Sequence, residues 1–221
     1  MNTVLAILAH EDAGPTIADF FPRWQKLGLP MIGFVPHGHR WPGPLIEKVF
    51  AQGESSHDGP AVIDRFILAL ETLHDTEYDH FVLMEYDTVN LVDRLPKIEW
   101  DVLSAGIMNA FYGGCPNDRY YTALSPWIFT RETLKPFLEG CRRQRNEASH
   151  QSWVNGLLDR FLAVVIIEEK IPASSIPELM PFPFEGLKPI EAILLNNMTW
   201  VHGWKRKEQF KHLWPKNQPE I

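Results

Sequence analysis

The sequence VLAILAHEDAGPTIADFFPRWQKLGLPMIGFV, residues 4–35, indicates the class of fold. It begins with an uninterrupted apolar run, Val4 to Ala9, which is typical of a strand buried on both faces. After Gly14 the apolar residues fall at helical spacing, and a second apolar run covers Met31 to Val35. Strand, helix and strand in this order predict a βαβ unit whose two strands are parallel.

The next segments continue the alternation of helices and strands. Residues 36–60 are rich in Gly, Pro and His, and we expect a long loop there, with at most one helical turn near Leu45 to Phe50. Ala61 to Leu73 has the apolar face of an amphipathic helix. Phe81 to Met84 and Val102 to Ile107 are further apolar runs, so we expect two more buried strands.

After Ile107 the pattern becomes mixed. The expected elements are a turn at Tyr112-Gly113-Gly114, an extended segment from Tyr120 to Phe129, a helix from its cap Thr130 to about Arg143, a helix from its cap Ser149 through Leu162, a short strand from Val164 to Ile167, a proline-rich loop from Pro172 to Pro189, and a last core segment from Thr199 to Trp204. This order predicts an α/β fold with a Rossmann-like, mainly parallel sheet flanked by helices and a mixed C-terminal half. With 221 residues, we expect one domain over residues 1–221.

Charge and cysteine content narrow the class of protein. The formal net charge is −7 and there is no long run of Lys or Arg, so a nucleic-acid partner is not expected. The cysteines, Cys115 and Cys141, are too few for a disulfide framework. The first apolar run lacks a basic leader, and no apolar stretch is long enough to cross a bilayer, so we expect a cytoplasmic protein without a transmembrane segment.

Polar residues follow two of the expected strands. His10, Glu11 and Asp12 follow the first strand, and Glu85-Tyr86-Asp87 follows the strand from Phe81 to Met84. Ligands of parallel α/β sheets bind beyond the carboxyl ends of the strands. In an extended segment, positions i and i+2 point the same way, so the two carboxylates can face one cation. Mg²⁺ and Mn²⁺ favour such oxygens and also bind phosphates, whereas the competing interpretation is a solvated acidic turn.

The motif Glu85-Tyr86-Asp87 at a strand end resembles the D-x-D-type motif of the GT-A glycosyltransferases. WVHGWK, residues 200–205, resembles the late histidine segment, often followed by glycine and lysine, that completes the metal site in several metal-dependent members. Arg65 precedes the acidic strand on a helix, where members often place a basic or amide residue against the nucleotide. SHQSWVN, residues 149–155, is similar to the Asp-Gln-x-x-x-Asn segment of some retaining families, with His150 in place of the aspartate. The resemblance covers roughly residues 3–205.

This resemblance implies metal-dependent transfer of a sugar from a nucleotide-diphosphate sugar to an unknown acceptor. Glu85, Asp87 and His202 would form the site of Mn²⁺ or Mg²⁺, which offsets the charge of the diphosphate leaving group. Asp87 would bind directly, Glu85 through water or on the ribose, and His202 through a nitrogen of its neutral ring. The expected donor-binding residues are Ala9, His10, Glu11, Arg65, Glu85 and Lys205, and the candidate catalytic bases are Glu147, His150 and Asp159.

Three other functions remain open at this point. A noncatalytic nucleotide-sugar-binding protein of the same fold would keep the metal ligands and lack the base, and the departure at His150 allows this. Another metal-dependent phosphate-ester enzyme, such as a phosphohydrolase, would bind a metal without preferring nucleotide sugars. A structural or partner-binding protein would depend on neither Asp87 nor His202. The sequence indicates no particular oligomeric state.

Overall fold

The computed structural model describes residues 2–44, 46–54, 60–110, 120–147, 158–181 and 199–202. The helices are the short 3-10 helix η1 (Glu11–Ala13) and the α-helices α1 (Gly14–Gln25), α2 (Pro60–His74), α3 (Arg131–Glu147) and α4 (Leu158–Glu168). The strands are β1 (Thr3–Leu8), β2 (Met31–Val35), β3 (Lys48–Ala51), β4 (His80–Glu85), β5 (Val89–Asn90), β6 (Leu103–Ala110), β7 (Tyr120–Thr130), β8 (Ala173–Ser175), β9 (Leu179–Pro181) and β10 (Trp200–His202).

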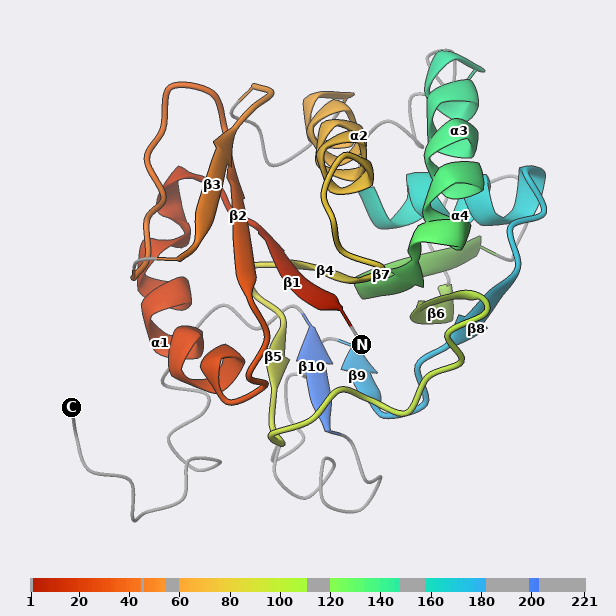
Figure 1. Ribbon diagram of the computed structural model, residues 1–221. Coiled ribbons are helices and arrows are strands. Elements are labelled where there is room, and N and C mark those ends of the chain that lie inside the picture. Colours follow the sequence, from red (N-terminus) through yellow and green to blue (C-terminus); the bar gives the residue numbers. More distant parts are fainter. Residues whose placement is uncertain are drawn as a thin grey trace.

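A seven-stranded sheet in the order β3-β2-β1-β4-β7-β6-β8 forms the centre of the described residues (Figure 1). The strand β7 is antiparallel to both of its neighbours, and the other pairings described in this sheet are parallel. A three-stranded sheet in the order β5-β10-β9 lies beside it. The prediction of an α/β fold with a Rossmann-like, mainly parallel sheet flanked by helices is therefore confirmed.

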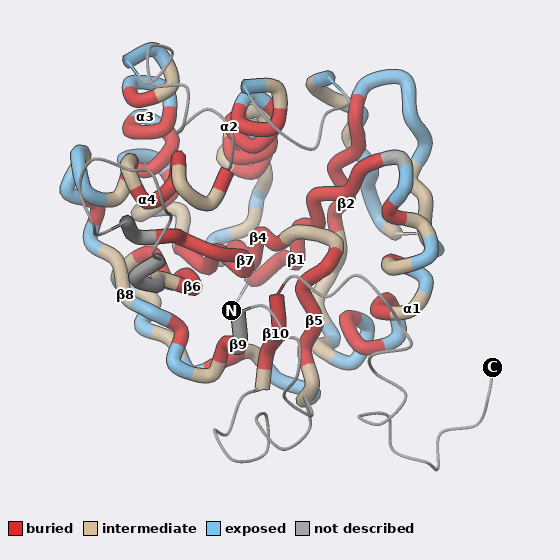
Figure 2. Tube along the Cα trace, turned by 180° about the vertical axis from the view of Figure 1, so that it is seen from behind, coloured by how far each residue is buried: buried red, intermediate tan, exposed pale blue. Residues whose placement is uncertain are grey.

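The central sheet separates two apolar layers. Alternate residues of each strand point to opposite faces, so Ala6 belongs to one core cluster and Leu5 to the other. The helices α2, α3 and α4 cover the first face, while α1 and the three-stranded sheet cover the second (Figure 1). The strands in the middle are accordingly buried, and exposed residues lie on the outer helices and turns (Figure 2).

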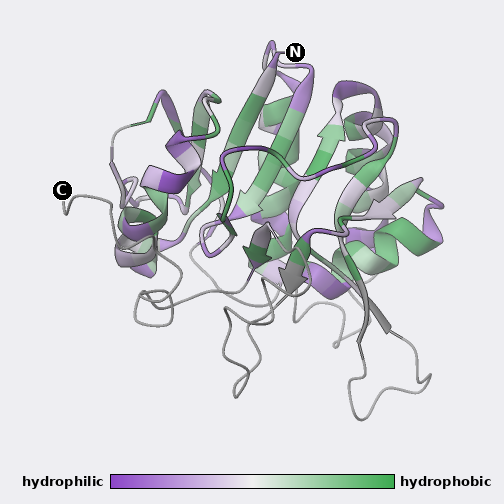
Figure 3. Ribbon diagram, turned by 90° about the horizontal axis from the view of Figure 1, so that it is seen from below, coloured by the Kyte–Doolittle hydropathy of each residue, from purple (hydrophilic) through white to green (hydrophobic). Residues whose placement is uncertain are grey.

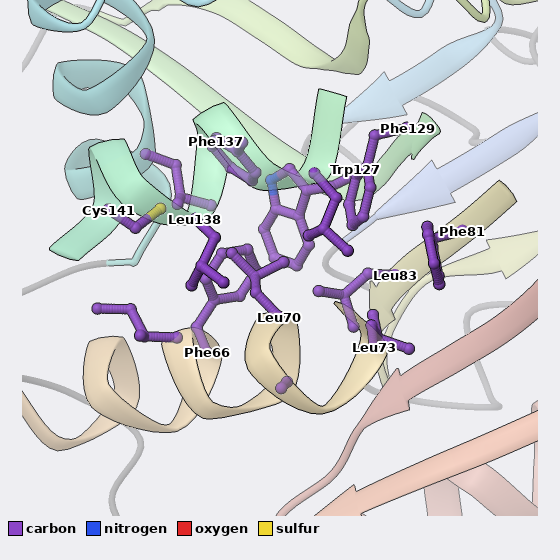
Figure 4. Packing of buried hydrophobic residues seen from close by; sticks show 14 of the residues in the cluster. Phe66, Leu70, Leu73, Phe81, Leu83, Trp127, Phe129, Phe137, Leu138 and Cys141 are labelled. Atoms are coloured by element: carbon purple, nitrogen blue, oxygen red, sulfur yellow. The ribbon is translucent and has the colours of Figure 1, made fainter. Parts of the chain in front are cut away.

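Aromatic rings fill the layer between the sheet and the helices α2 and α3 (Figure 4). The ring of Phe66 meets Trp127 edge-on at a centroid distance of 5.0 Å and Phe137 at 6.2 Å. Such edge-to-face pairs add about 0.5–1.5 kcal/mol each beyond the area that they bury. The helices themselves carry both hydrophilic and hydrophobic residues, whereas the central strands are mostly hydrophobic (Figure 3). The helices therefore pack on the sheet through one face only.

Several expected elements are confirmed. Val4 to Ala9 and Met31 to Val35 correspond to the parallel neighbours β1 and β2, and α1 connects them. The helix expected from Ala61 to Leu73 is α2. Thr130 caps α3, because its Oγ1 accepts a hydrogen bond from the backbone N–H of Thr133 at 3.3 Å.

Three segments differ from the expectation. Lys48 to Ala51 is a strand at the edge of the sheet and neither loop nor helical turn. Its apolar run, Val49 to Ala51, is too short to distinguish a strand from a loop or a turn. Val164 to Ile167 belongs to α4, and this helix ends at Glu168 rather than at Leu162. The prediction failed because a short run of β-branched residues is compatible with either a strand or a buried helix. The expected loop from Pro172 contains the strands β8 and β9, which have three residues each.

Other expectations lie outside the described residues. They are the turn at Tyr112-Gly113-Gly114, the helix start at Ser149, and residues 203–205. Among the described residues, no helix is long and apolar enough to span a membrane.

Candidate metal centre

The order of the central strands places a ligand site next to β1. After β1 the chain forms β2 and β3 on one side of β1, and it later forms β4 on the other side. The strand order therefore reverses direction between β1 and β4. In open α/β sheets such a reversal opens a crevice at the carboxyl ends of the strands. The two ends lie level, because Leu8 pairs with Glu85 and the backbone N–H of Tyr86 donates to the carbonyl of Leu8 at 3.0 Å.

Residues that follow these two strands meet at this crevice. The ring of His10, after β1, stands edge-on to the ring of Tyr86, after β4, with centroids 4.4 Å apart. His10 also caps η1, because its Nδ1 accepts the backbone N–H of Asp12 at 3.0 Å. A neutral His10 therefore carries its proton on Nε2.

The smaller sheet brings His202 to the acidic motif. β10 pairs antiparallel with β5, and Val201 lies opposite Val89. One further step in this register places His202 beside Thr88, next to Asp87 in the chain. Thr88 and His202 are 114 residues apart in the sequence, and the pairing of two short strands brings them together. One of these strands, β5, has only 2 residues.

Glu85, Asp87 and His202 form a compact group. One ligand atom of each lies within 4.8 Å of those of the other two. His202 Nε2 is 3.6 Å from Glu85 Oε2, and His202 Nδ1 is 3.7 Å from Asp87 Oδ1. An octahedral cation with bonds of about 2.1 Å has ligand atoms roughly 3 to 4 Å apart. These two distances involve different ring nitrogens, so the limit of 4.8 Å describes one ligand set, and it is slightly wider than the spacing in an occupied octahedral site.

Burial gives a second indication that the group fits a cation. Asp87 and His202 are buried, with 6% and 5% of their surface exposed. Asp87 Oδ1 is buried and accepts no hydrogen bond from the residues that the structure describes. A buried acceptor without a donor costs about 1–3 kcal/mol, and more when it is charged. A bound cation would satisfy this oxygen and offset the two carboxylate charges.

Hydroxyl groups surround the ring of His202 on its Nδ1 side. Thr88 Oγ1 lies 3.0 Å from His202 Nδ1, and Ser125 Oγ lies 2.8 Å from Thr88 Oγ1. Ser125 Oγ also accepts the backbone N–H of Glu85 at 2.9 Å. These hydrogen bonds fix the orientation of the ring, as outer partners do for metal-binding histidines in general.

A cavity of about 40 Å³ adjoins the group. It is lined by Leu8, His10, Val62, Arg65, Glu85, Tyr86 and Leu158. Arg65 comes from the first turns of α2 and is buried. The cavity thus brings a guanidinium and an imidazole, both hydrogen-bond donors, beside a carboxylate of the candidate metal centre.

A larger hollow of about 390 Å³ lies between α2 and α3. Two pairs of its residues contact each other: Arg142 lies 2.6 Å from Glu71, and His74 lies 3.4 Å from Asp75. It has no group comparable to Glu85, Asp87 and His202, so its size does not make it the better candidate site.

Two side chains near the centre have altered proton affinity. Burial raises the pKa of Asp159, in the first turn of α4, and this effect outweighs the backbone hydrogen bond and the charge of Arg160, which lower it. The pKa of Tyr86 lies well above its usual range, because the hydroxyl is partly buried and faces the negative charges of Asp87 and Glu85. Tyr86 is therefore a neutral hydrogen-bonding group at neutral pH.

The structure brings several expected site residues together. Glu85, Asp87 and His202 form the group, and His10 and Arg65 line the adjacent cavity. Ala9 is buried beside His10, and Glu11 lies in η1. Glu147 is exposed at the end of α3, away from the group as far as the described contacts show. His150 and Lys205 lie outside the described residues.

Six contributors were missed in the sequence. Four of them line the cavity: Leu8, Val62, Tyr86 and Leu158. Thr88 and Ser125 contact His202 or Glu85. Tyr86 could have been found, because it stands between the two carboxylates of the acidic motif. Thr88 and Ser125 could not have been found, because no sequence spacing links their hydroxyls to the metal ligands.

Comparison of the sequence with models of protein families and with curated proteins finds no match. Assignment of a function therefore depends on the geometry of the candidate metal centre.

Proposed function

We propose that this chain is a metal-dependent glycosyltransferase that takes a sugar from a nucleotide-diphosphate sugar. The observation that carries the proposal is the group of Glu85, Asp87 and His202 at the crevice between β1 and β4. Carboxylate oxygens with one imidazole nitrogen suit Mn²⁺ or Mg²⁺, and such cations commonly bind phosphates as well. The resemblance of Glu85-Tyr86-Asp87 and of residues 200–205 to the GT-A enzymes favours a diphosphate ligand at this place.

The residues of the centre would divide the work of donor binding. Glu85, Asp87 and His202 would hold the cation, whose chemistry is to offset the charge that grows on the diphosphate as the glycosidic bond breaks. Arg65 adds a permanent positive charge at the cavity beside Glu85. His10, which lines the same cavity, is the candidate for a contact with the nucleotide part of the donor. Lys205, which follows β10, is the further candidate for a phosphate contact.

Asp159 is the best supported of the three candidate bases. It lies at the start of α4 next to Leu158, which lines the cavity. A base for the acceptor hydroxyl works best with a pKa near the working pH, and burial shifts the pKa of Asp159 in that direction. In the proposed reaction, a carboxylate oxygen of Asp159 would take the hydroxyl proton as the acceptor oxygen bonds to the sugar carbon and the diphosphate leaves.

A thermal-shift screen tests the proposal. Nucleoside diphosphates and nucleotide sugars are compared with and without Mn²⁺, since a ligand of the native state raises the apparent stability. At about 100 times the Kd we expect a gain of about 2.7 kcal/mol, or roughly 5–10 °C for a chain of this size. We expect the melting temperature to rise only when both the metal and a diphosphate are present.

Matched variants locate the binding site. Asp87→Asn keeps the shape of the side chain but removes its charge, so it should abolish the rise. Asp93→Asn changes an exposed carboxylate six residues further on and should leave the rise intact. An unchanged rise in Asp87→Asn would refute the site. Metal-dependent phosphate release without preference for nucleotide sugars would instead favour a phosphohydrolase, and binding without sugar transfer a noncatalytic protein.

A cytoplasmic location belongs to the same proposal. It is supported by Cys141, a residue of α3 whose free thiol is buried in the core.

A further inference from the structure

Two buried hydroxyls connect the acidic motif with the ring of His202. The backbone N–H of Glu85 donates to Ser125 Oγ at 2.9 Å, and Thr88 Oγ1 bridges Ser125 Oγ at 2.8 Å and His202 Nδ1 at 3.0 Å. The side chains of Thr88 and Ser125 are fully buried. A continuous chain of hydrogen bonds thus runs from the backbone of one candidate ligand to the ring of another.

The position of Thr88 is itself fixed. Its carbonyl accepts the indole N–H of Trp24 at 3.0 Å, and its backbone N–H donates to the carbonyl of Glu85 at 3.0 Å. The side chain of Trp24 is completely buried under the central sheet. The hydroxyl of Thr88 is therefore held in place, and only its hydrogen can rotate.

For a neutral His202 ring, counting protons leaves two arrangements of this chain. A backbone N–H can only donate, so Ser125 Oγ must accept from Glu85. Thr88 has one hydroxyl hydrogen, which goes either to His202 or to Ser125. If it goes to His202 Nδ1, a neutral ring carries its proton on Nε2. If it goes to Ser125, the ring donates Nδ1–H to Thr88, and Nε2 keeps a lone pair.

A cation can use only the second arrangement. A metal ligand nitrogen must be unprotonated, and Nε2 is the nitrogen that faces Glu85 Oε2 at 3.6 Å. Asp87 Oδ1 is 3.7 Å from Nδ1, too far for a hydrogen bond, so Thr88 is the nearer acceptor of the Nδ1 proton.

We infer that Thr88 is a positioning residue whose Oγ1 accepts the Nδ1–H of His202 and so keeps Nε2 available to the cation. The inference rests on the proposed function, because it assigns a role to Thr88 at the same metal centre. Ser125 completes the arrangement by accepting the hydroxyl hydrogen of Thr88. The contact is preformed in the metal-free protein and is retained when the cation binds.

Metal affinity without any nucleotide is the first test. Mn²⁺ is titrated into the full chain and free Mn²⁺ is measured by electron paramagnetic resonance. Thr88→Val has nearly the same shape but no hydroxyl, and it should weaken binding by about 10–100-fold. Thr88→Ser restores the hydroxyl and should restore most of the affinity. Thr3→Val, at a buried threonine at the far end of β1, controls for the general effect of the substitution.

The proton position in His202 is the second test, and a merely structural role of Thr88 would not change it. Nitrogen-15 spectra of the neutral ring should show Nδ1–H in the wild type, without metal and with Mg²⁺, and loss of that preference in Thr88→Val. Equal Mn²⁺ affinity of Thr88→Val and the wild type, or Nε2–H in the wild type, would overturn the inference. If the wild type binds no Mn²⁺, the proposed function fails, and the spectrum of the metal-free protein still decides on the role of Thr88.

Discussion

Asp87 shows at the scale of one residue why a ligand is expected here. Its Oδ1 is buried and lacks a hydrogen-bond donor among the described residues, while Glu85 brings a second carboxylate within reach of the same histidine. Two neighbouring carboxylate charges in a largely buried place destabilise the folded protein unless a positive charge offsets them. A divalent cation would neutralise both charges.

Asp159 should lower the stability of the folded protein at neutral pH and also act in catalysis. Burial raises the pKa of Asp159 in the folded protein, so the folded state binds the proton more tightly than the unfolded state does. The stability associated with this carboxyl is present below its unfolded pKa and is lost as the pH rises through the raised folded pKa. Asp159→Asn cannot ionise and should therefore be more stable than the wild type at pH 7, by a margin that shrinks toward pH 4 in urea unfolding.

The same variant tests the proposed base. Sugar transfer should fall by about 100-fold or more in Asp159→Asn, because general bases typically contribute 10² to 10⁴ in rate. Donor binding should stay normal. A variant that is less stable than the wild type at pH 7, or that transfers sugar at the normal rate, would contradict this role.

At the scale of elements, the three-stranded sheet depends on Glu178. Its carboxylate receives two hydrogen bonds from Arg94, at 2.9 and 3.2 Å, and one from the hydroxyl of Thr199. Its carbonyl accepts the backbone N–H groups of Thr199 and Trp200 at 2.9 and 3.1 Å. Glu178 thereby holds the start of β10, the strand that carries His202.

Glu178→Gln should weaken this sheet in a pH-dependent way. Partial burial acts to raise the pKa of Glu178, but the hydrogen bonds from Arg94 and Thr199 outweigh it and hold the pKa below its usual range. A lowered pKa adds stability above the unfolded pKa that is lost as the pH falls through the folded pKa. We expect a loss of about 1–2 kcal/mol at pH 7 that becomes smaller as the pH falls toward 3, measured by urea unfolding.

An exposed carboxylate provides the control for this prediction. Glu77→Gln should change the free energy of unfolding by less than about 0.5 kcal/mol at either pH. The same loss in Glu178→Gln at pH 3 and pH 7 would show that the charge of Glu178 does not stabilise the sheet.

The length of an element decided how well it could be predicted from the sequence. Long apolar runs and amphipathic periods, such as Val4 to Ala9 and Ala61 to Leu73, carry enough residues to define a period. β5 and β9 have 2 and 3 residues, too few for any pattern. The strand predicted from Val164 to Ile167 was wrong, because the packing of α4 on the sheet and on α3 overrides the local β propensity.

At the scale of the whole molecule, the candidate centre exists only because two sheets meet. The central sheet supplies Glu85 and leads to Asp87, and the three-stranded sheet supplies His202. The carboxylates could be predicted, since a single strand end places them together. Ser125 could not, because it reaches Glu85 only through the pairing of β7 with β4, 40 residues along the chain.

Glu85, Asp87 and His202 are proposed to hold a divalent cation that binds a diphosphate. Anomalous diffraction from crystals soaked with Mn²⁺ and a nucleoside diphosphate would locate this ion. We predict an Mn²⁺ peak within about 2.0–2.4 Å of an Asp87 oxygen and of His202 Nε2, with diphosphate oxygens also bound to the ion. A diphosphate bound without the ion, or an ion bound away from these residues, would contradict the account.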